Sequence, residues 1–174
     1  LMRSSAASDV YKRQHAFDLA EHRVKLIQDN VKRLGLRNVQ AAQGDATRFQ
    51  EAYAGADRVL CDVPCSGIGV LRHKPEVKEK SPEALAELPA LQLAILENGA
   101  RYVKAGGILQ YSTCTILKEE NEGVAEAFLQ AHPEFEPVPV YPALGGVLEQ
   151  PMATILPEMF GSDGFFVAKF RKKG

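Results

Sequence analysis

The spacing of hydrophobic residues along the chain changes repeatedly between a helical and an extended pattern. Apolar positions three or four residues apart predict amphipathic helices over residues 19–34, 81–104 and 118–131. Short apolar runs bounded by turn residues predict strands over residues 15–18, 38–42, 58–63, 108–112 and 164–170. Pro89 should break or kink the second helix, because proline has no backbone N–H. Helices that alternate with strands before a late hairpin indicate an α/β fold with a mostly parallel sheet and a terminal antiparallel pair.

Polar or reactive side chains stand at the carboxyl ends of four consecutive predicted strands. They are Asp18, Asp45, Asp62 with Cys65, and Cys114. Ligands of open parallel sheets bind outside the carboxyl ends of the strands. A single acid at such a place is usually a helix cap or a turn residue, and that alternative stays open for Asp18 and Asp45. Four such positions in succession predict a shared cleft.

Composition and charge describe an ordinary domain and point to no particular partner. The chain has 174 residues, a formal net charge of −1 and 45% hydrophobic residues. No apolar stretch approaches the roughly 20 residues of a membrane-spanning helix, so no membrane partner is expected. The neutral balance is mild evidence against RNA binding by this segment alone, because phosphate contacts need clustered basic residues. Arg72 and Lys74 could contact phosphate, or could simply belong to an exposed loop.

The start of the sequence shows no structural period. It also lacks the apolar core of a signal peptide. We expect residues 1–14 to be a non-native or disordered leader and residues 15–174 to form the domain. Three cysteines without a secretory signal indicate a reducing cytoplasm rather than a disulfide framework.

The three cysteines fall into two kinds of sequence context. Cys61 lies inside an apolar strand, where a thiol behaves as a small buried hydrophobe. Cys65 and Cys114 instead follow strand ends among Pro, Ser, Thr and Gly, which suits reactive thiols. A zinc site would need a second close pair of ligands, which Cys114 does not have, so no metal is expected. The C-x-x-C spacing of thioredoxin-type redox sites is also absent.

Four short motifs, in order, carry a resemblance to a known family. Residues 62–67 read DVPCSG, 111–115 YSTCT, 154–157 TILP and 163–166 DGFF. Over residues 16–172 the chain resembles the Sun/Fmu (RsmB-like) branch of the RNA 5-methylcytosine methyltransferases, which is related to the Nop/Sun group. The resemblance implies a class I, Rossmann-like sheet that binds S-adenosylmethionine. It also implies an RNA substrate, by preference small-subunit ribosomal RNA and otherwise transfer RNA.

The same resemblance implies a role for each strand-end residue. Cys114 would be the nucleophile that adds to C6 of cytosine, and Cys65 would assist release of the adduct. Asp62 would lie against the base or the methyl donor. Asp18 would bind the ribose hydroxyls of S-adenosylmethionine, and Asp45 would approach its adenine. Because the target base must leave its stack, single-stranded or loop RNA is the expected substrate.

Activation of the nucleophile needs more than local helix electrostatics. A free cysteine has a pKa near 8.5, so only about 3% is thiolate at pH 7. A helix that begins after Thr115 would direct its positive end toward the loop, for about 0.3–1 kcal/mol. That is less than one pKa unit, so bound substrate, a neighbouring proton acceptor or the sulfonium charge must contribute the rest.

The resemblance also implies a glycine-rich motif I, which should precede Asp18 and is not found there. We therefore expect a sheet without its first strand and motif I, and a chain that alone aggregates, is inactive and binds S-adenosylmethionine weakly. Alternatives are an inactive fragment or an RNA-binding scaffold protein with this fold. A DNA cytosine-5 methyltransferase would use the P-C dipeptide, with Cys65 as attacker; the T-C dipeptide at Cys114 favours RNA.

Overall fold

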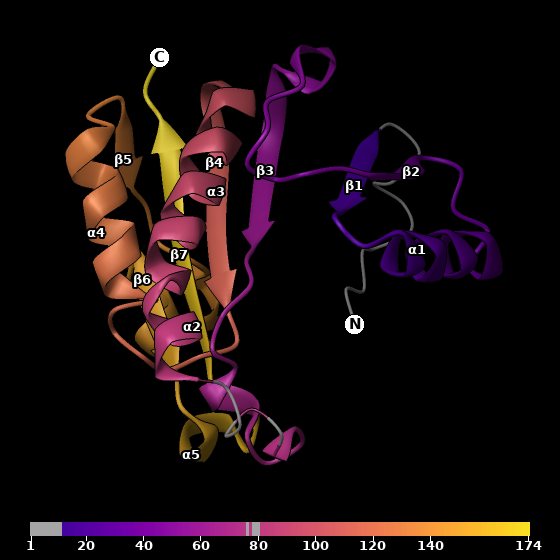
Figure 1. The fold of residues 1–174 in the computed structure, drawn as a ribbon. Coiled ribbons are helices and arrows are strands. Elements are labelled where there is room, and N and C mark those ends of the chain that lie inside the picture. The colour runs from indigo at the N-terminus through magenta and orange to yellow at the C-terminus, as the bar shows by residue number, and fades with distance from the viewer. Residues whose placement is uncertain (1–11, 76, 78–80) are drawn as a thin grey trace. The chain divides into compact units, whose positions relative to one another are not determined.

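The computed structural model describes residues 12–75, 77 and 81–174, and these form two compact units (Figure 1). The first unit ends at Arg48 and the second begins at Phe49. Residues 1–11, most of the expected leader, lie outside the described residues.

The first unit is a two-stranded parallel sheet with one helix. Strands β1 (Gln14–Asp18) and β2 (Val39–Gln43) pair in parallel, and the chain between them forms α1 (Glu21–Arg33). The expected helix and both expected strands are confirmed, with small shifts of their ends. Gly35 has φ +64°, a conformation that favours glycine and ends the helix where the sequence predicts.

The second unit is a mixed sheet with helices. Its helices are α2 (Pro82–Ala86), α3 (Leu88–Tyr102), α4 (Glu122–Ala131) and α5 (Pro157–Phe160). Its 3-10 turns are η2 (Glu51–Tyr53), η3 (Ile68–Val70), η5 (Pro142–Leu144) and η6 (Gly146–Glu149). Its strands are β3 (Ala56–Asp62), β4 (Val103–Thr113), β5 (Phe135–Pro137), β6 (Met152–Ile155) and β7 (Phe165–Lys172).

Strand pairing in this sheet follows the order β3-β4-β7-β5, and β6 also pairs with β7. Only the β3–β4 pair is parallel among the described strands of this unit, whereas β7 runs antiparallel to β4, β5 and β6. Because β7 is antiparallel to each of these three strands, β3, β4, β5 and β6 run in one direction and β7 in the other. The expectation of a mostly parallel sheet is therefore confirmed in part: most strands share a direction, but β7 lies among them and makes the pairing mixed. The terminal antiparallel pair is confirmed as β6–β7. The short connection over residues 156–164 accounts for the antiparallel β6–β7 pair, since a parallel crossover needs a dozen or more residues.

The helix expected over residues 81–104 is two helices. Ser81 Oγ accepts a hydrogen bond from the Ala84 N–H at 3.2 Å and begins α2. Pro89 lies in the first turn of α3, where its missing N–H breaks no helical bond. The predicted break at this proline is confirmed.

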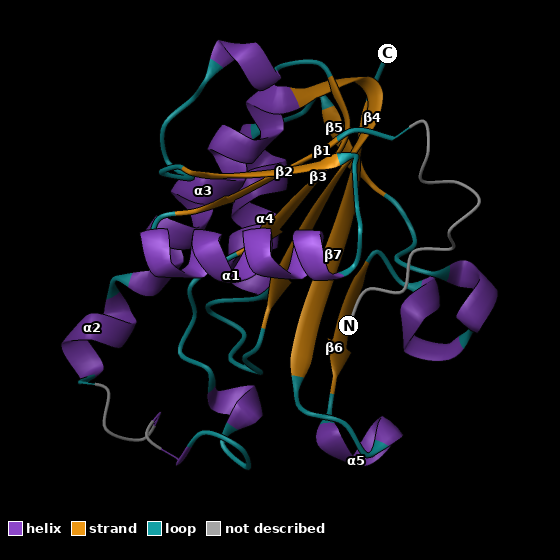
Figure 2. Cartoon of the chain, turned by 90° about the vertical axis from the view of Figure 1, so that its right-hand side faces the viewer, coloured by secondary structure: helices purple, strands orange, loops and turns teal. Residues whose placement is uncertain are grey.

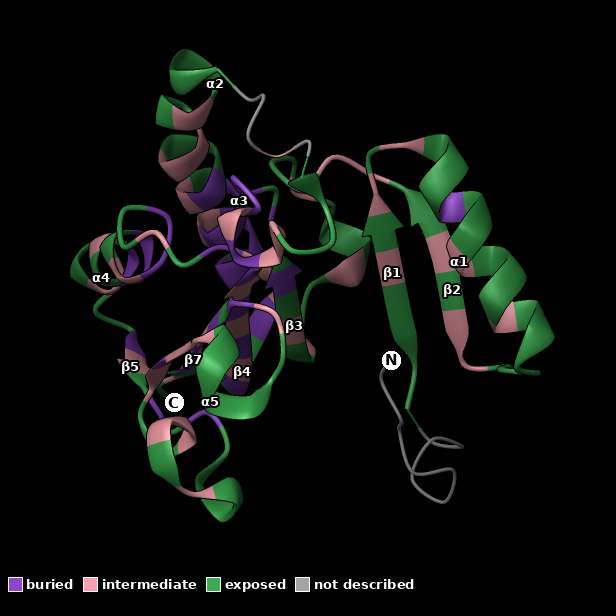
Figure 3. Cartoon of the chain, turned by 90° about the horizontal axis from the view of Figure 1, so that it is seen from below, coloured by how far each residue is buried: buried purple, intermediate pink, exposed green. Residues whose placement is uncertain are grey.

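The core of the second unit lies between the sheet and the helices α3 and α4, which pack side by side along one face (Figure 1). Figure 2 shows the strands of this sheet after a quarter turn. Buried segments gather there in Figure 3. The large side chains that are completely buried there are Leu96, Leu109, Tyr111, Phe128, Phe166 and Phe170. The Tyr111 and Phe166 rings meet edge to face, with centroids 6.1 Å apart. This core fixes β3 and β4, the strands that carry the cysteines.

Close packing of α3 on β3 leads to a testable prediction about Gly99. A Cβ atom added at Gly99 would lie 2.5 Å from the buried Sγ of Cys61. Gly99→Ala should therefore lower the free energy of unfolding by about 1–3 kcal/mol, as overpacking does in other cores. The double variant with Cys61→Ala should recover part of that loss in chemical denaturation. Strictly additive effects would contradict the contact.

Candidate active site

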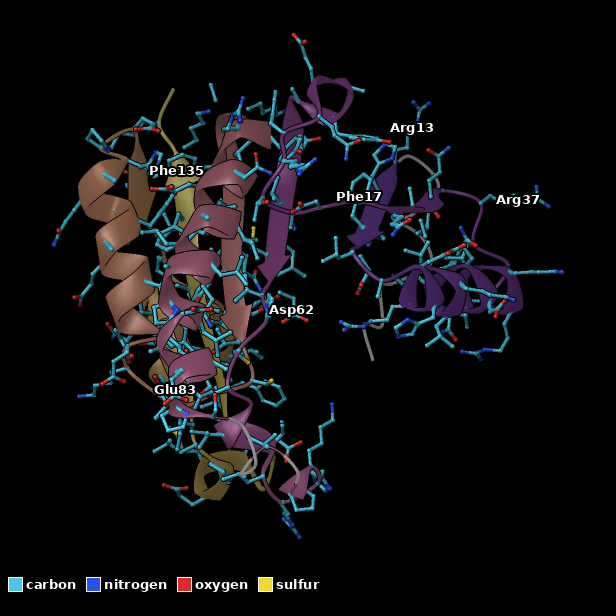
Figure 4. All side chains as sticks on the ribbon, in the orientation of Figure 1. Arg13, Phe17, Arg37, Asp62, Glu83 and Phe135 are labelled. Atoms are coloured by element: carbon cyan, nitrogen blue, oxygen red, sulfur yellow. The ribbon has the colours of Figure 1, made fainter. Side chains whose placement is uncertain are left out.

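The loops that carry Cys65 and Cys114 leave the same edge of the sheet. Strands β3 and β4 are parallel neighbours, with Asp62 opposite Ser112. The last bond between them runs from the Val63 N–H to the Ser112 carbonyl at 3.2 Å. Pro64 cannot donate to a ladder, so the β3 chain turns away from the sheet here. Figure 4 shows Asp62 at this end of β3.

The two loops bring their thiols into contact. Cys65 Sγ lies 3.1 Å from Cys114 Sγ, and the Cys114 N–H donates to Cys65 Sγ at 3.3 Å. Cys65 is only 9% exposed, whereas Cys114 is partly exposed. The predicted meeting of these two thiols is confirmed, and Cys114 is the more accessible of them.

Burial raises the pKa of two of the three cysteines, Cys65 and Cys61. Desolvation, followed by the hydrogen bond with Cys114, raises the pKa of Cys65 from 9.0 to about 12. Desolvation also raises the pKa of Cys61 to about 12, in keeping with its predicted place in the core. Cys65 is therefore a protonated thiol near neutral pH, able to donate a hydrogen bond to sulfur beside it.

The backbone around Cys114 is held by two glycines that approach each other closely. The Gly69 N–H donates to the Cys114 carbonyl at 3.1 Å, and the Gly164 N–H donates to the Gly69 carbonyl at 2.9 Å. Near them His73 Nε2 lies 3.3 Å from Asp163 Oδ1. The DGFF segment thus contacts the cysteine loops through Asp163 and Gly164.

Sequence reasoning missed a group of buried polar side chains beneath these loops. Its members are Ser66, Gln92, Thr113, Thr115, Glu120 and Asn121, each at most 2% exposed. Gln92 carried a possible signal, because it is the one polar residue in the stretch 88–96 of helix α3. The adjacent Glu120 and Asn121 gave none, because they fall in the first turn of the helix predicted over residues 118–131, where polar residues usually cap the helix or face solvent.

The start of α4 differs from the expectation. We expected a helix beginning after Thr115, but α4 begins at Glu122, and the chain between them forms turns. The reason is local: the Asn121 side chain bonds back to Thr113 and Thr115, so the chain at residues 113–121 folds on itself. The helix dipole therefore lies farther from Cys114 than expected, and the effect falls off within one turn.

The acid predicted beside the cysteines lies where expected. Asp62 ends β3, is exposed, and accepts a hydrogen bond from Ser112 Oγ at 3.2 Å. Its carboxylate therefore stands at the same sheet edge as the loops of Cys65 and Cys114. Contact with a base or a methyl donor stays a prediction.

The two other acids belong to the first unit and have local turn partners. Asp18 Oδ1 accepts from the Ala20 N–H at 2.8 Å, and its other oxygen lies 3.6 Å from Arg23. Asp45 Oδ1 accepts from the side chain and backbone of Thr47, and these bonds lower the pKa of Asp45. The turn interpretation is thus confirmed for both. Their ligand roles and the shared cleft stay predictions.

Arg72 and Lys74 are exposed in the turn that follows η3. Phosphate contact and an ordinary exposed loop both stay open for them.

In the part of the chain that the structure describes, no three His, Cys, Asp or Glu side chains come together as metal ligands do. Over those same residues, no helix has the length and apolar character needed to span a membrane.

The raised thiol pKa values predict lower stability at alkaline pH. In the unfolded chain a thiol loses its proton near pH 9, whereas Cys61 and Cys65 in the folded chain keep theirs to about pH 12. The free energy of unfolding should therefore fall from about pH 9 to pH 12, by at most about 1.4 kcal/mol per pH unit for each buried thiol. Urea unfolding of wild type and Cys61→Ala should give a shallower fall for the variant; parallel curves would contradict the prediction.

Comparison with solved structures defines the class of the fold. The crystal structure of NSun6 from Pyrococcus horikoshii with SFG, an analogue of S-adenosylmethionine, matches with a TM-score of 0.76 and 28% identity. The match covers 93% of this chain and 42% of that one. A methyltransferase homolog protein from the same organism matches at TM-score 0.70 and 30% identity, covering 91% and 52%. The chain has the α/β fold of class I S-adenosylmethionine-dependent methyltransferases.

Sequence comparison identifies the family. A family model described as 16S rRNA methyltransferase RsmB/F matches residues 7–171. A probable ribosomal RNA small subunit methyltransferase B from Bacillus subtilis is 43% identical over 167 residues, which cover 91% of this chain and 37% of the relative. The chain belongs to the RsmB/F methyltransferase family, which confirms the resemblance. It spans a little over a third of the length of that relative.

Proposed function

We propose that the protein is an S-adenosylmethionine-dependent RNA cytosine-5 methyltransferase that acts on small-subunit ribosomal RNA. The observation that carries the proposal is the 3.1 Å contact between Cys65 Sγ and Cys114 Sγ, supplied by loops at neighbouring strand ends. Two thiols at one point suit a reaction that first forms and then breaks a bond from sulfur to a pyrimidine. The names of the family model and of the relative support ribosomal RNA as the substrate.

The chemistry needs a nucleophile because C5 of cytosine reacts poorly with a methyl group. Addition of the Cys114 thiolate to C6 makes C5 electron-rich, so that C5 can accept the methyl group. A base then removes the C5 proton, and the C6–Sγ bond breaks with its electron pair returning to Cys114. Cys65, a protonated thiol beside that sulfur, can donate a hydrogen bond to the departing thiolate.

The exposure of the two cysteines supports one of them as the attacking residue. An attacking sulfur must reach the ring and be a thiolate. Cys65 is buried and its pKa is raised to about 12, whereas Cys114 is partly exposed. These differences favour Cys114 as the nucleophile and weigh against the DNA-type assignment, in which Cys65 would attack.

The residues at the strand ends fit the methyl donor chemically. Carboxylates just past a strand are common acceptors for ribose hydroxyls, and Asp18 ends β1 with its side chain partly exposed. Asp18 would hold the ribose of S-adenosylmethionine, Asp45 its adenine, and Asp62 the base or the donor. The bound donor supplies an electrophilic methyl group. Arg72 and Lys74 would contact RNA phosphates.

Labelled methyl transfer tests this function. The protein at its full natural length is incubated with methyl-labelled S-adenosylmethionine and unmodified small-subunit ribosomal RNA, and the RNA is digested to nucleosides. We expect the label in 5-methylcytidine, and mapping then gives the position. Label in another nucleoside would contradict the assignment to cytosine C5. No label above a blank without protein would contradict the proposal and favour a scaffold role.

A further inference from the structure

The residues that flank each cysteine are held by buried side chains of one short segment. That segment is the Glu120–Asn121 pair, which lies between the YSTCT loop and α4. Glu120 is 2% exposed and Asn121 is completely buried. Polar side chains are buried at a cost unless they are hydrogen-bonded, so their bonding partners indicate why they are there.

Glu120 bonds to the Cys65 loop. Its Oε2 accepts from the Ser66 N–H and from Gln92 Nε2, both at 2.8 Å. Gln92 Nε2 also donates to the Pro64 carbonyl at 2.9 Å. The backbone is therefore fixed on both sides of Cys65, directly by Glu120 after it and through Gln92 before it.

Asn121 bonds to the Cys114 loop in the same manner. Its Oδ1 accepts from Thr113 Oγ1 at 2.6 Å, and its Nδ2 donates to the Thr115 carbonyl at 3.0 Å. These two bonds fix the residues on both sides of Cys114. A direct bond from Ser66 Oγ to Thr115 Oγ1 at 2.7 Å joins the two loops.

We propose that the Glu120–Asn121 pair positions the two thiols, with Glu120 setting Cys65 and Asn121 setting Cys114. The two residues are adjacent in the chain, so covalent geometry fixes the distance between them. Because each one bonds to a different cysteine loop, this fixed distance also limits how far the two loops can move apart. Both are positioning residues, since they act through Ser66, Gln92 and the threonines. The catalytic consequence rests on the proposed function; the geometric part does not.

Variants of similar size can distinguish the role of Glu120 from that of Asn121. Glu120→Met keeps most of the volume but removes both acceptor oxygens, whereas Glu120→Gln keeps one oxygen that can accept. Asn121→Asp keeps the acceptor for Thr113 and loses the donor to Thr115. Glu119→Gln is the matched control, because Glu119 is exposed and next to the pair. Thermal melts show which variants fold.

The first readout is disulfide formation between Cys65 and Cys114, followed by mass spectrometry. Diamide takes up two hydrogens as the thiols become a disulfide, and this bond demands close, well-directed sulfur atoms. We expect the rate to fall at least about tenfold in Glu120→Met and in Asn121→Asp, because loosened thiols meet less often in that geometry. Glu120→Gln and Glu119→Gln should stay near the wild-type rate. Unchanged rates in folded Glu120→Met and Asn121→Asp would overturn the proposal.

The second readout is the covalent protein–RNA complex during methylation, with the protein at full natural length. Glu120→Met should displace Cys65 and let the complex accumulate, whereas Asn121→Asp should displace Cys114 and slow its formation. A general structural defect would instead lower both steps together in both variants, and that result would also overturn the proposal. If wild type forms no complex while the disulfide rates change as expected, the proposed function fails and the positioning role stands.

Discussion

Cys114→Ala should remove the covalent protein–RNA complex and lower methyl transfer by roughly a thousandfold or more, as loss of a covalent nucleophile does in other enzymes. Cys65→Ala should behave differently. Because Cys114 is still present, it can attack C6 and C5 can be methylated. The departing thiolate, however, loses the neighbour that lies 3.1 Å away, so the complex should accumulate. Denaturing gel shifts with labelled RNA measure both outcomes.

Cys61→Ala is the matched control for these variants. Cys61 carries the same thiol but is buried in the core against Gly99, away from the cysteine loops. Its replacement should reduce stability moderately and leave the complex and its turnover close to wild type. A complex that persists in Cys114→Ala but disappears in Cys65→Ala would reverse the assigned roles.

Gly69→Ala and Gly164→Ala should each damage both folding and catalysis. A Cβ at Gly69 would overlap the Gly164 carbonyl oxygen and lie 2.9 Å from the Cys114 carbonyl oxygen. A Cβ at Gly164 would lie 2.8 Å from Ile116 and 3.0 Å from the Gly69 Cα. We expect a loss of about 3 kcal/mol in the free energy of unfolding, near the upper end for overpacking. Displacement of Cys114 should also lower methyl transfer about a hundredfold.

Gly106→Ala is the control for glycine replacement as such. Gly106 has φ +74° but nothing within 4 Å of an added Cβ, so only backbone strain opposes the alanine. We expect a loss of about 1 kcal/mol and unchanged methyl transfer per folded molecule. Equal losses at Gly69 and Gly106 would show that steric contact between the loops is unimportant.

Much of the second unit could be predicted from the sequence, because its elements follow strong local signals. A helix was predicted to begin at Ser81 and to break or kink at Pro89, and the structure has the start of α2 at the first and a separate helix α3 at the second. The antiparallel β6–β7 pair was predictable as a late hairpin. The position of β7 between β4 and β5 could not be obtained from periodicity, because side-chain alternation does not show which distant strands pair.

The candidate site was predictable where chemistry is visible in residue type, as with the thiols of Cys65 and Cys114. It was not predictable where a residue acts by burial. Glu120 and Asn121 look like an ordinary helix start, and only the three-dimensional structure shows that their side chains turn inward to Ser66 and Thr113. Asp18 is a different case. Its side chain makes the local turn hydrogen bond that is usual for an acid at a strand end, and this bond does not test whether Asp18 also binds a ligand.

The most direct test of the central claim is to identify which sulfur binds the base. RNA that contains 5-fluorocytidine should stop the reaction after methyl transfer, because fluorine at C5 cannot leave as the proton does. After nuclease and protease digestion, mass spectrometry should find the modified nucleotide on the peptide that contains Cys114. The peptide that contains Cys65 should be unmodified. A nucleotide attached to Cys65, or a complex that forms equally well in Cys114→Ala, would contradict the account.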